Sequence, residues 1–166
     1  MNQEFQIRNA TYSDLKHIKD LQNHHILHTD DIYSEDPKSD EEVLDWYESQ
    51  KNDGFPIIVA EINGVFAGFA NYGQFRKRPC YSTTVEHSVY LTKENRSKGL
   101  GSALMNELFD IARKHKIHAM MGGIDSKNQN SIEFHEKMGF EVVGKIPEVA
   151  YKKGRWLELV LMQKIL

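Results

Sequence analysis

A loop with two basic residues and two glycines separates a strand-like segment from a long amphipathic segment. The loop and the end of the preceding strand consist of Val89, Tyr90, Leu91, Arg96, Ser97, Lys98, Gly99, Leu100, Gly101 and Ser102. Glycine lets a ligand approach the main chain closely, and the unpaired N–H groups of a first helical turn attract anions. Together with the charges of Arg96 and Lys98, the pattern predicts a pyrophosphate site.

The loop by itself is a short motif. Its glycine spacing differs from the dinucleotide fingerprint and from the Walker loop, which ends in Gly-Lys-Ser/Thr. A glycine-rich helix start that binds no ligand is therefore an equally good interpretation of the loop taken alone.

Glu86 and His87 lie on opposite faces of the strand predicted over 82–91. Because side chains alternate along a strand, Glu86 shares its face with Ser88, whereas His87 shares the other face with Val89. A polar face suits a cleft, although a solvent-facing acid is the alternative for Glu86. For His87 the alternative is a hydrogen-bonded histidine of the core.

The positions of the apolar residues predict an ordered series of strands and helices around these candidates. Alternating or continuous apolar runs predict strands, and a spacing of three and four predicts helices. Ser39, followed by Glu41 and Glu42, is typical of a helix N-cap. The expected elements are a strand at 5–8, helices from 13 and 39, strands at 56–61, 66–72 and 82–91, a helix at 99–116, a strand at 119–124, a helix at 131–138, and strands at 140–144 and 156–162.

This order of elements predicts a mixed α+β fold. Asn63-Gly64 between two strands is typical of a hairpin turn, and the strand–helix–strand order around 99–116 implies a crossover. A mixed sheet with helices on both faces is therefore expected. No repeat or linker interrupts the 166 residues, so a single domain over 1–166 is expected.

Composition and charge argue against several classes of protein. Apolar residues make up 40% of the chain, which is enough for a folded core. Residues 1–83 carry eight basic and fourteen acidic residues, whereas 84–166 carry thirteen and ten. A basic second half suits a small phosphorylated ligand, and a random surface asymmetry explains it equally well. A nucleic-acid partner is not expected, because the chain lacks a basic stripe.

The chain gives no sign of a disulfide, a membrane span or a metal site. Cys80 is the single cysteine, and no partnered base marks it as a nucleophile. The first residues lack the apolar segment of a signal peptide, and no apolar run approaches the roughly 18 residues of a membrane span. A cytoplasmic protein is therefore expected. His24 and His28 lie one helical turn apart, but no third metal ligand has convincing spacing.

Several separated segments together resemble one enzyme family. The Arg-x-x-Gly-x-Gly loop at 96–101, Asn128 seven residues before His135, and the turn at 138–140 resemble the GNAT superfamily of acyl-CoA-dependent N-acyltransferases. The resemblance implies a mostly antiparallel, twisted sheet of six to seven strands with a splayed parallel pair. Segments similar to the phosphinothricin and methionine sulfoximine acetyltransferases of that superfamily lie at 54–56, 73–78, 84–90, 123–125 and 154–156.

By this resemblance, the ligand of the glycine loop is acetyl-CoA, a co-substrate that needs no metal. Acetyl-CoA would lie in a wedge between the strands at 86–91 and 119–124. The main chain of 89–91 would pair with the pantetheine arm, and 96–102 would hold the pyrophosphate. The Asn128 amide would hydrogen-bond the same arm.

The resemblance also implies catalytic roles for Glu86 and His135. An amine must be uncharged when it attacks the thioester, and an α-amine with a pKa near 8 is about one-tenth neutral at pH 7, which costs roughly 1.4 kcal/mol. Glu86 is expected to act as general base, directly or through water, while positioning supplies most of the acceleration. His135 is expected to protonate the leaving thiolate or to pair with Glu86; the alternative is that it merely lines the site.

The implied acceptor is a small amino-acid-like molecule. The guanidinium groups of Arg76 and Arg78 suit its carboxylate and its phosphinate or sulfoximine oxygens. The alternative is that these arginines belong to a loop exposed to solvent. The loop at 30–37 with Tyr33 is expected to close over the acceptor, and the family implies a homodimer. Acetylation of a polyamine or a protein N-terminus, and non-catalytic acyl-CoA sensing, stay open. The residues implied to bind the acceptor are Phe75, Arg76, Arg78, Tyr81, Glu86 and His87.

Overall fold

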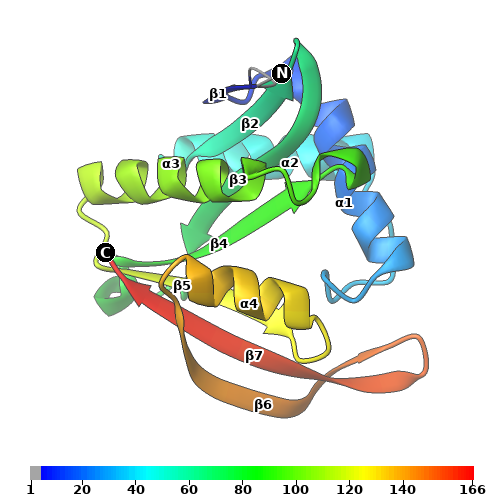
Figure 1. Cartoon of the computed structure of the whole chain (residues 1–166), viewed down its shortest axis with the longest axis vertical. Helices are drawn as coiled ribbons and strands as arrows, with labels where there is room; N and C mark the ends of the chain where they lie inside the picture. The colour runs from blue at the N-terminus through cyan, green and yellow to red at the C-terminus, as the bar shows by residue number, and fades with distance from the viewer. Residues whose placement is uncertain (1–4) are drawn as a thin grey trace.

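Residues 5–166, which the computed structural model describes, form a seven-stranded sheet and four α-helices (Figure 1). The strands are β1 (Phe5–Asn9), β2 (Ile57–Ile62), β3 (Val65–Gln74), β4 (Thr84–Leu91), β5 (Ala119–Asp125), β6 (Glu141–Lys152) and β7 (Arg155–Ile165). The helices are α1 (Leu15–His28), α2 (Asp40–Asn52), α3 (Leu100–Lys114) and α4 (Gln129–Lys137), with short 3-10 turns at Tyr12–Asp14, Pro79–Tyr81 and Lys93–Asn95.

The strands are ordered β1-β2-β3-β4-β5-β7-β6. Strands β4 and β5 are parallel, and the other neighbouring pairs are antiparallel. The parallel pair arises because α3 carries the chain back across the sheet between β4 and β5. Asn63 and Gly64, with φ of 51° and 76°, form the predicted hairpin turn. The predicted mixed, mostly antiparallel α+β fold is confirmed.

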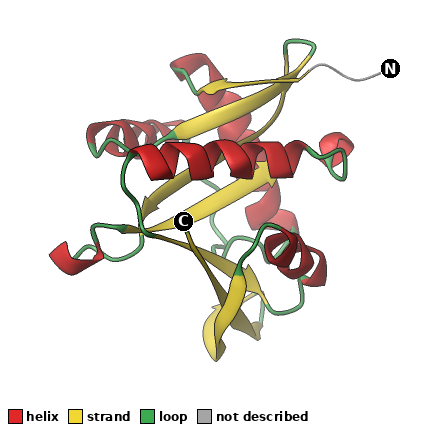
Figure 2. Cartoon of the chain, turned by 60° about the vertical axis from the view of Figure 1, so that its left-hand side comes forward, coloured by secondary structure: helices red, strands yellow, loops and turns green. Residues whose placement is uncertain are grey.

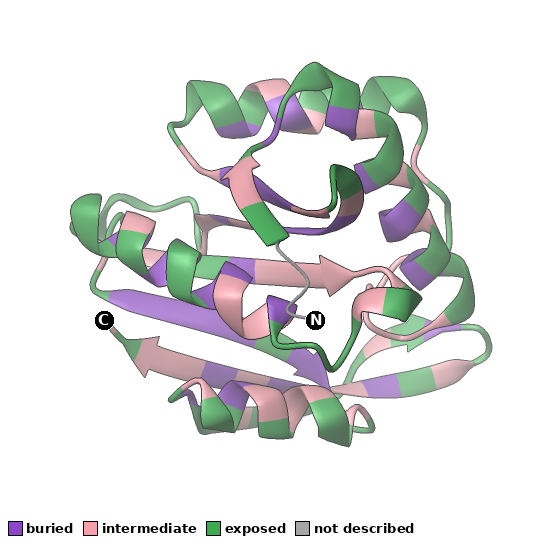
Figure 3. Ribbon diagram, turned by 45° about the horizontal axis from the view of Figure 1, so that its top comes forward, coloured by how far each residue is buried: buried purple, intermediate pink, exposed green. Residues whose placement is uncertain are grey.

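Helices lie on both faces of the sheet (Figure 2), and a separate hydrophobic core attaches them on each face. Ile58 and Ala60 of β2 belong to the core that contains α3, whereas Ile57 and Val59 belong to the core that contains α1 and α2. Strands β2 and β5 are consequently buried along most of their length (Figure 3). The prediction of helices on both faces is confirmed, with α4 on the same face as α3.

The C-terminal hairpin is longer than its sequence pattern predicts. The pattern ends at 144, but β6 continues to Lys152 and pairs with β7. The register shifts between Ile146 and Ala150, and Pro147 lies in this interval. Apolar and polar residues therefore do not alternate there, and the pairing with β7 defines the strand instead.

Strands β4 and β5 separate after three residue pairs. Their pairing begins at Thr84–Ala119 and ends at Glu86–Met121. Strand β4 nevertheless stays paired with β3 as far as Leu91. The two parallel strands diverge to the right in Figure 1. Beyond Glu86, the β5-facing edge of β4 has no strand partner within residues 5–166, which confirms the predicted splayed pair.

Candidate functional site

A cleft of about 650 Å³ opens where β4 and β5 separate. Its walls come from the end of β4, the second half of β5, the N-terminal part of α3, helix α4, and the end of α1 with the loop that follows it. A volume of this size suits a small-molecule ligand. The predicted site residues that line the cleft are His87, Val89, Tyr90, Leu91, Arg96, Ser97, Gly101, Asn128 and His135.

The glycine loop presents main-chain N–H groups at one end of the cleft. Gly99 is the N-cap of α3 and has φ of 80°, a left-handed conformation that glycine adopts without strain. Ser97, at φ 61°, makes a second left-handed turn in the loop. Among the described residues no side chain caps α3, so the N–H groups of its first turn remain available to an anion. Lys98 extends from the same loop, where its Nζ lies 3.5 Å from Asn95 Oδ1.

A hydrogen-bonded chain crosses the cleft from this loop to α4. Arg96 Nη2 lies 3.5 Å from His25 Nε2, His25 Nδ1 lies 2.7 Å from Asp31 Oδ2, and Asn128 Nδ2 donates to Asp31 Oδ1 at 2.7 Å. The bond from His25 lowers the pKa of Asp31. Asn128 also caps α4, because its Oδ1 accepts a hydrogen bond from the Ser131 amide.

Sequence reasoning missed His25 and Asp31 as cleft residues. The available signal was the position of His25 on the apolar face of the helix, where a polar side chain needs a buried partner. Asp31 lies in an acidic stretch of the chain, and nothing in its spacing distinguishes it from its neighbours. The two side chains meet because α1 ends beside the wide end of the cleft.

The loop between α1 and α2 is fastened to the C-terminal hairpin and to β5. Lys152 is buried and donates hydrogen bonds to the carbonyls of Thr29 and Ile32, each at 2.7 Å. Tyr33 donates its hydroxyl to Asp125 Oδ2 at 2.8 Å, and burial together with this carboxylate raises the pKa of Tyr33. These bonds fix the loop next to β5; its closure over an acceptor stays a prediction.

Two consecutive glycines in β5 make room on both faces of the sheet. A Cβ atom at Gly122 would lie 3.1 Å from His87 Nε2 and 3.4 Å from His135 Nε2, whereas one at Gly123 would lie 3.1 Å from Glu86 Oε1. Since successive strand residues face opposite sides, the imidazoles and the carboxylate lie on different faces, as the period-two pattern predicts for Glu86 and His87. His135 therefore meets His87 and not Glu86.

His87 and His135 form a buried imidazole pair. Their Nε2 atoms are 3.1 Å apart, and their ring centres are 5.0 Å apart. Phe140 packs against both rings. His135 Nδ1 lies 2.6 Å from the Ser131 carbonyl oxygen. Burial lowers the pKa of His87 to about 3 and lowers the pKa of His135 as well, which favours the neutral form of both rings.

Glu86 carries a solvent-accessible carboxylate at the point where β4 and β5 part. It makes no side-chain hydrogen bond or ion pair within residues 5–166. The apolar side chain of Leu159 lies beside the same space above Gly123. Partial desolvation raises the pKa of Glu86, which makes the carboxylate a stronger base than an ordinary glutamate.

The remaining acceptor candidates lie in the loop before β4, outside the lining of the cleft. The rings of Phe75 and Tyr81 are 6.2 Å apart, and the Arg76 guanidinium lies over Phe75 at 5.4 Å. Arg76 and Arg78 are exposed, and neither makes an ion pair with the rest of the described chain. Strand β4 thus carries a basic loop before its start, Glu86 in its first half, and the glycine loop after its end.

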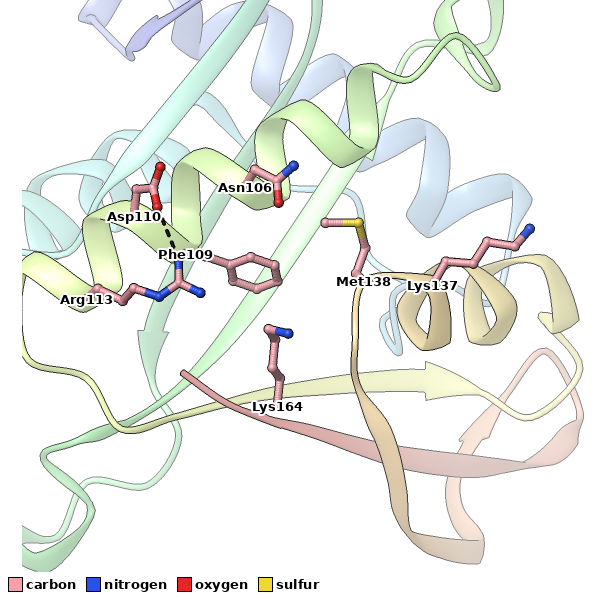
Figure 4. A pocket seen from close by; sticks show the side chains of 7 residues that line it. All are labelled: Asn106, Phe109, Asp110, Arg113, Lys137, Met138 and Lys164. Carbon is pink, nitrogen blue, oxygen red and sulfur yellow. Dashed lines mark hydrogen bonds and ion pairs between the residues drawn. The ribbon is translucent and has the colours of Figure 1, made fainter.

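A smaller hollow of about 470 Å³ lies between α3 and the C-terminal strand (Figure 4). Lys164 Nζ lies 5.2 Å from the centre of the Phe109 ring, and Arg113 pairs with Asp110 at 3.1 Å. None of the predicted site residues lines this hollow. It shares Lys137 of α4 with the lining of the cleft at the splayed strands.

The described part of the chain holds no cluster of three or more His, Cys, Asp or Glu side chains that could bind a metal ion. The rings of His24 and His28 are 5.0 Å apart on α1. No helix among residues 5–166 is long and apolar enough to cross a membrane. Cys80 is a free, exposed thiol.

Comparisons with known proteins agree on one family. A family model described as an acetyltransferase (GNAT) domain matches residues 7–161. An L-methionine sulfoximine/L-methionine sulfone acetyltransferase of Salmonella typhimurium is 41% identical over 157 residues, which are 95% of this chain and 92% of that protein.

Two solved structures have nearly the same fold. A phosphinothricin acetyltransferase of Sinorhizobium meliloti in complex with acetyl-CoA gives a TM-score of 0.93 at 32% identity, covering 98% of this chain and 88% of that one. A ribosomal-protein-alanine N-acetyltransferase of Brucella melitensis gives a TM-score of 0.94 at 39% identity, covering 97% and 99%. Both proteins are named as acetyltransferases, and their names differ in the acceptor.

Proposed function

The chain belongs to the GNAT acetyltransferase family, and we propose that it transfers the acetyl group of acetyl-CoA to the α-amine of a small amino-acid-like acceptor. The observation that carries the proposal is the splayed β4–β5 pair, with Glu86 at its apex and the glycine loop at its wide end. The methionine sulfoximine/sulfone and phosphinothricin relatives support acceptors of that type.

The cleft suits acetyl-CoA bound with its thioester towards Glu86. The free edge of β4 offers the main chain of Val89–Leu91 to the pantetheine amides, as a neighbouring strand would. Asn128 keeps one amide N–H for the same arm, since its other hydrogen bonds go to Asp31 and Ser131. The residues proposed to hold the diphosphate are Arg96, Ser97, Lys98, Gly99, Leu100, Gly101 and Ser102.

The reaction joins the amine nitrogen to the acetyl carbonyl carbon and breaks the carbon–sulfur bond. Glu86 accepts the proton that the amine nitrogen loses, directly or through water, and the departing thiolate of CoA takes up one proton from water, so that amine and thioester give amide and thiol. Making the amine neutral costs only roughly 1.4 kcal/mol at pH 7, whereas alignment of amine and thioester contributes on the order of 7–11 kcal/mol. Positioning therefore supplies most of the acceleration, and main-chain N–H groups near Leu91 are placed to polarise the carbonyl.

The Arg76 and Arg78 side chains are proposed to bind the acceptor carboxylate. We expect methionine sulfone and methionine sulfoximine to be acetylated, and the corresponding amine without a carboxylate to react poorly. Arg76→Ala and Arg78→Ala should each raise KM for the amino-acid acceptor about 10- to 100-fold, which is the effect of one lost charge-assisted hydrogen bond. Thiol release from acetyl-CoA measures both effects.

Lys77→Ala is the matched control, because Lys77 lies between the two arginines and is equally exposed. Its KM should stay within twofold of the wild-type value. Equal kcat/KM for acceptors with and without the carboxylate would contradict this acceptor class.

The Brucella melitensis structure favours a second candidate, a protein N-terminus, for which a peptide beginning with alanine is the test substrate. Binding of acetyl-CoA without thiol release for any amine would indicate a sensor.

The outer face of the β6–β7 hairpin supports a homodimer. Strand β6 is the last strand of the sheet, and it and β7 expose Val142, Val143, Ile146, Val149, Tyr151 and Trp156. An unpaired edge with this many apolar side chains is typical of an interface. Sedimentation should give twice the mass of one chain, and Trp156→Ser should weaken the dimer. Val65→Ser, at an equally exposed position of the opposite hairpin, should leave it intact; a wild-type monomer at micromolar concentration would contradict the dimer.

We further propose that residues 1–166 act as one catalytic domain in the cytoplasm. One sheet includes strands from both ends of the described chain, which supports a single unit. The single cysteine, which is a free thiol, suits a reducing compartment.

A further inference from the structure

Hydrogen-bond partners fix where the protons of the buried imidazole pair lie. The Ser131 carbonyl oxygen can only accept, so His135 Nδ1, 2.6 Å away, carries a hydrogen. In the neutral ring, His135 Nε2 then bears a lone pair. His87 Nε2, 3.1 Å from it, must therefore donate the hydrogen between the two rings. His87 Nδ1 is left with a lone pair.

The surroundings of the pair favour this neutral arrangement. Gly122 and the Phe140 ring pack against both imidazoles. Glu133 and Lys137 of α4 line the same cleft, but neither bonds to either ring within residues 5–166, and Glu86 lies on the opposite face of the sheet. No carboxylate in the described chain is thus in contact with the pair to stabilise a positive charge.

His87 Nδ1 is buried and has no hydrogen-bond partner among the described residues. If His135 took up a proton at Nε2, the hydrogen of His87 would have to move from Nε2 to Nδ1 to preserve the bond between the rings. That move would bury an unpartnered N–H group, which is costly. Because an N–H group at Nδ1 would have no acceptor, the shared hydrogen stays on His87 Nε2.

We propose that His87 is a positioning residue that keeps His135 neutral, with its Nε2 lone pair occupied. His135 then lines the cleft as an uncharged ring. It gains a proton only when its bond to His87 breaks, and so it does not supply the proton of the departing thiolate from its resting state. This last point rests on the proposed acetyl transfer, whereas the proton positions do not.

Nitrogen-15 spectra of the labelled full chain test the proton positions without any acceptor or activity. Two-bond correlations should show the Nδ1–H form of His135 and the Nε2–H form of His87 at pH 7. In His87→Phe, which removes the donor, His135 should titrate at higher pH than in the wild type. In His87→Gln, whose terminal amide N–H replaces Nε2–H, the titration should return towards the wild-type position.

A cationic His135 at pH 7, or its Nε2–H neutral form, would overturn the proposal in the wild-type protein, even if a variant fails to fold. An unchanged His135 titration in folded His87→Phe would do the same. Where acetyl transfer is observed, kcat should not decline between pH 6.5 and 9. A decline that disappears in His135→Phe would identify His135 as the acid and overturn the kinetic part. Absence of any transfer would refute the proposed function. The spectra would still decide where the protons of His87 and His135 lie.

Discussion

Glu86→Gln is expected to lower kcat for acetyl transfer about 100-fold and to leave the Kd of acetyl-CoA unchanged. General-base groups typically contribute 10²- to 10⁴-fold, and the lower end applies because making the amine neutral is a small part of the barrier. Glutamine preserves the volume above Gly123 and removes the basic oxygen. Stopped-time thiol release gives kcat, and calorimetric titration of acetyl-CoA gives Kd.

Two further variants separate the effect on kcat from an effect on acetyl-CoA binding. Glu136→Gln alters an exposed carboxylate of α4 outside the cleft lining and should leave kcat within twofold of the wild type. Arg96→Ala, in the glycine loop, should instead weaken acetyl-CoA binding and change kcat less than Glu86→Gln does. If Glu86→Gln retained full kcat, Glu86 would not be the base.

The pH dependence of kcat also tests whether Glu86 is the base. Desolvation raises the pKa of Glu86, so the carboxylate is protonated at higher pH than an ordinary glutamate as the solution is acidified. Wild-type kcat should therefore fall as the pH drops towards and through that raised pKa. Glu86→Gln should lack this limb of the profile, since glutamine does not titrate.

Gly68→Ala is expected to lower the free energy of unfolding by about 3 kcal/mol, at the upper end of the usual range for overpacking. A Cβ atom at Gly68 would lie 2.4 Å from the Tyr90 carbonyl oxygen and 3.0 Å from Leu91 Cα. These are main-chain atoms of β4, so relief requires the two paired strands to move apart. Urea unfolding followed by circular dichroism measures the loss, and the melting temperature should fall by about 6–12 °C.

Gly144→Ala is the matched control for this change. A Cβ atom at Gly144 meets nothing within 4 Å, and its φ is not in the left-handed region. Its stability should equal that of the wild type to within about 0.5 kcal/mol. Because Tyr90 and Leu91 also line the cleft, Gly68→Ala should weaken acetyl-CoA binding in the fraction that remains folded. Wild-type stability in Gly68→Ala would show that β3 and β4 tolerate the wider spacing.

Much of the architecture could be predicted because local periodicity and turn chemistry agree along the chain. The Asn63-Gly64 turn, the alternation of Glu86 and His87 and the helix after Gly99 each follow from a few neighbouring residues. The length of β6 could not be predicted, because its pairing with β7 continues across an irregular segment around Pro147. Such long-range pairing leaves no local periodicity.

The sequence by itself determined the order of the elements, the glycine loop at the start of α3 and the faces to which Glu86 and His87 belong. Tertiary structure decided which side chains meet. His135 pairs with His87 across 48 residues, and Asn128 bonds Asp31 across 97. Contacts of this kind depend on where β4 and β5 part and how α1 and α4 dock beside them. Packing of distant elements fixes that geometry, and spacing along the chain carries no record of it.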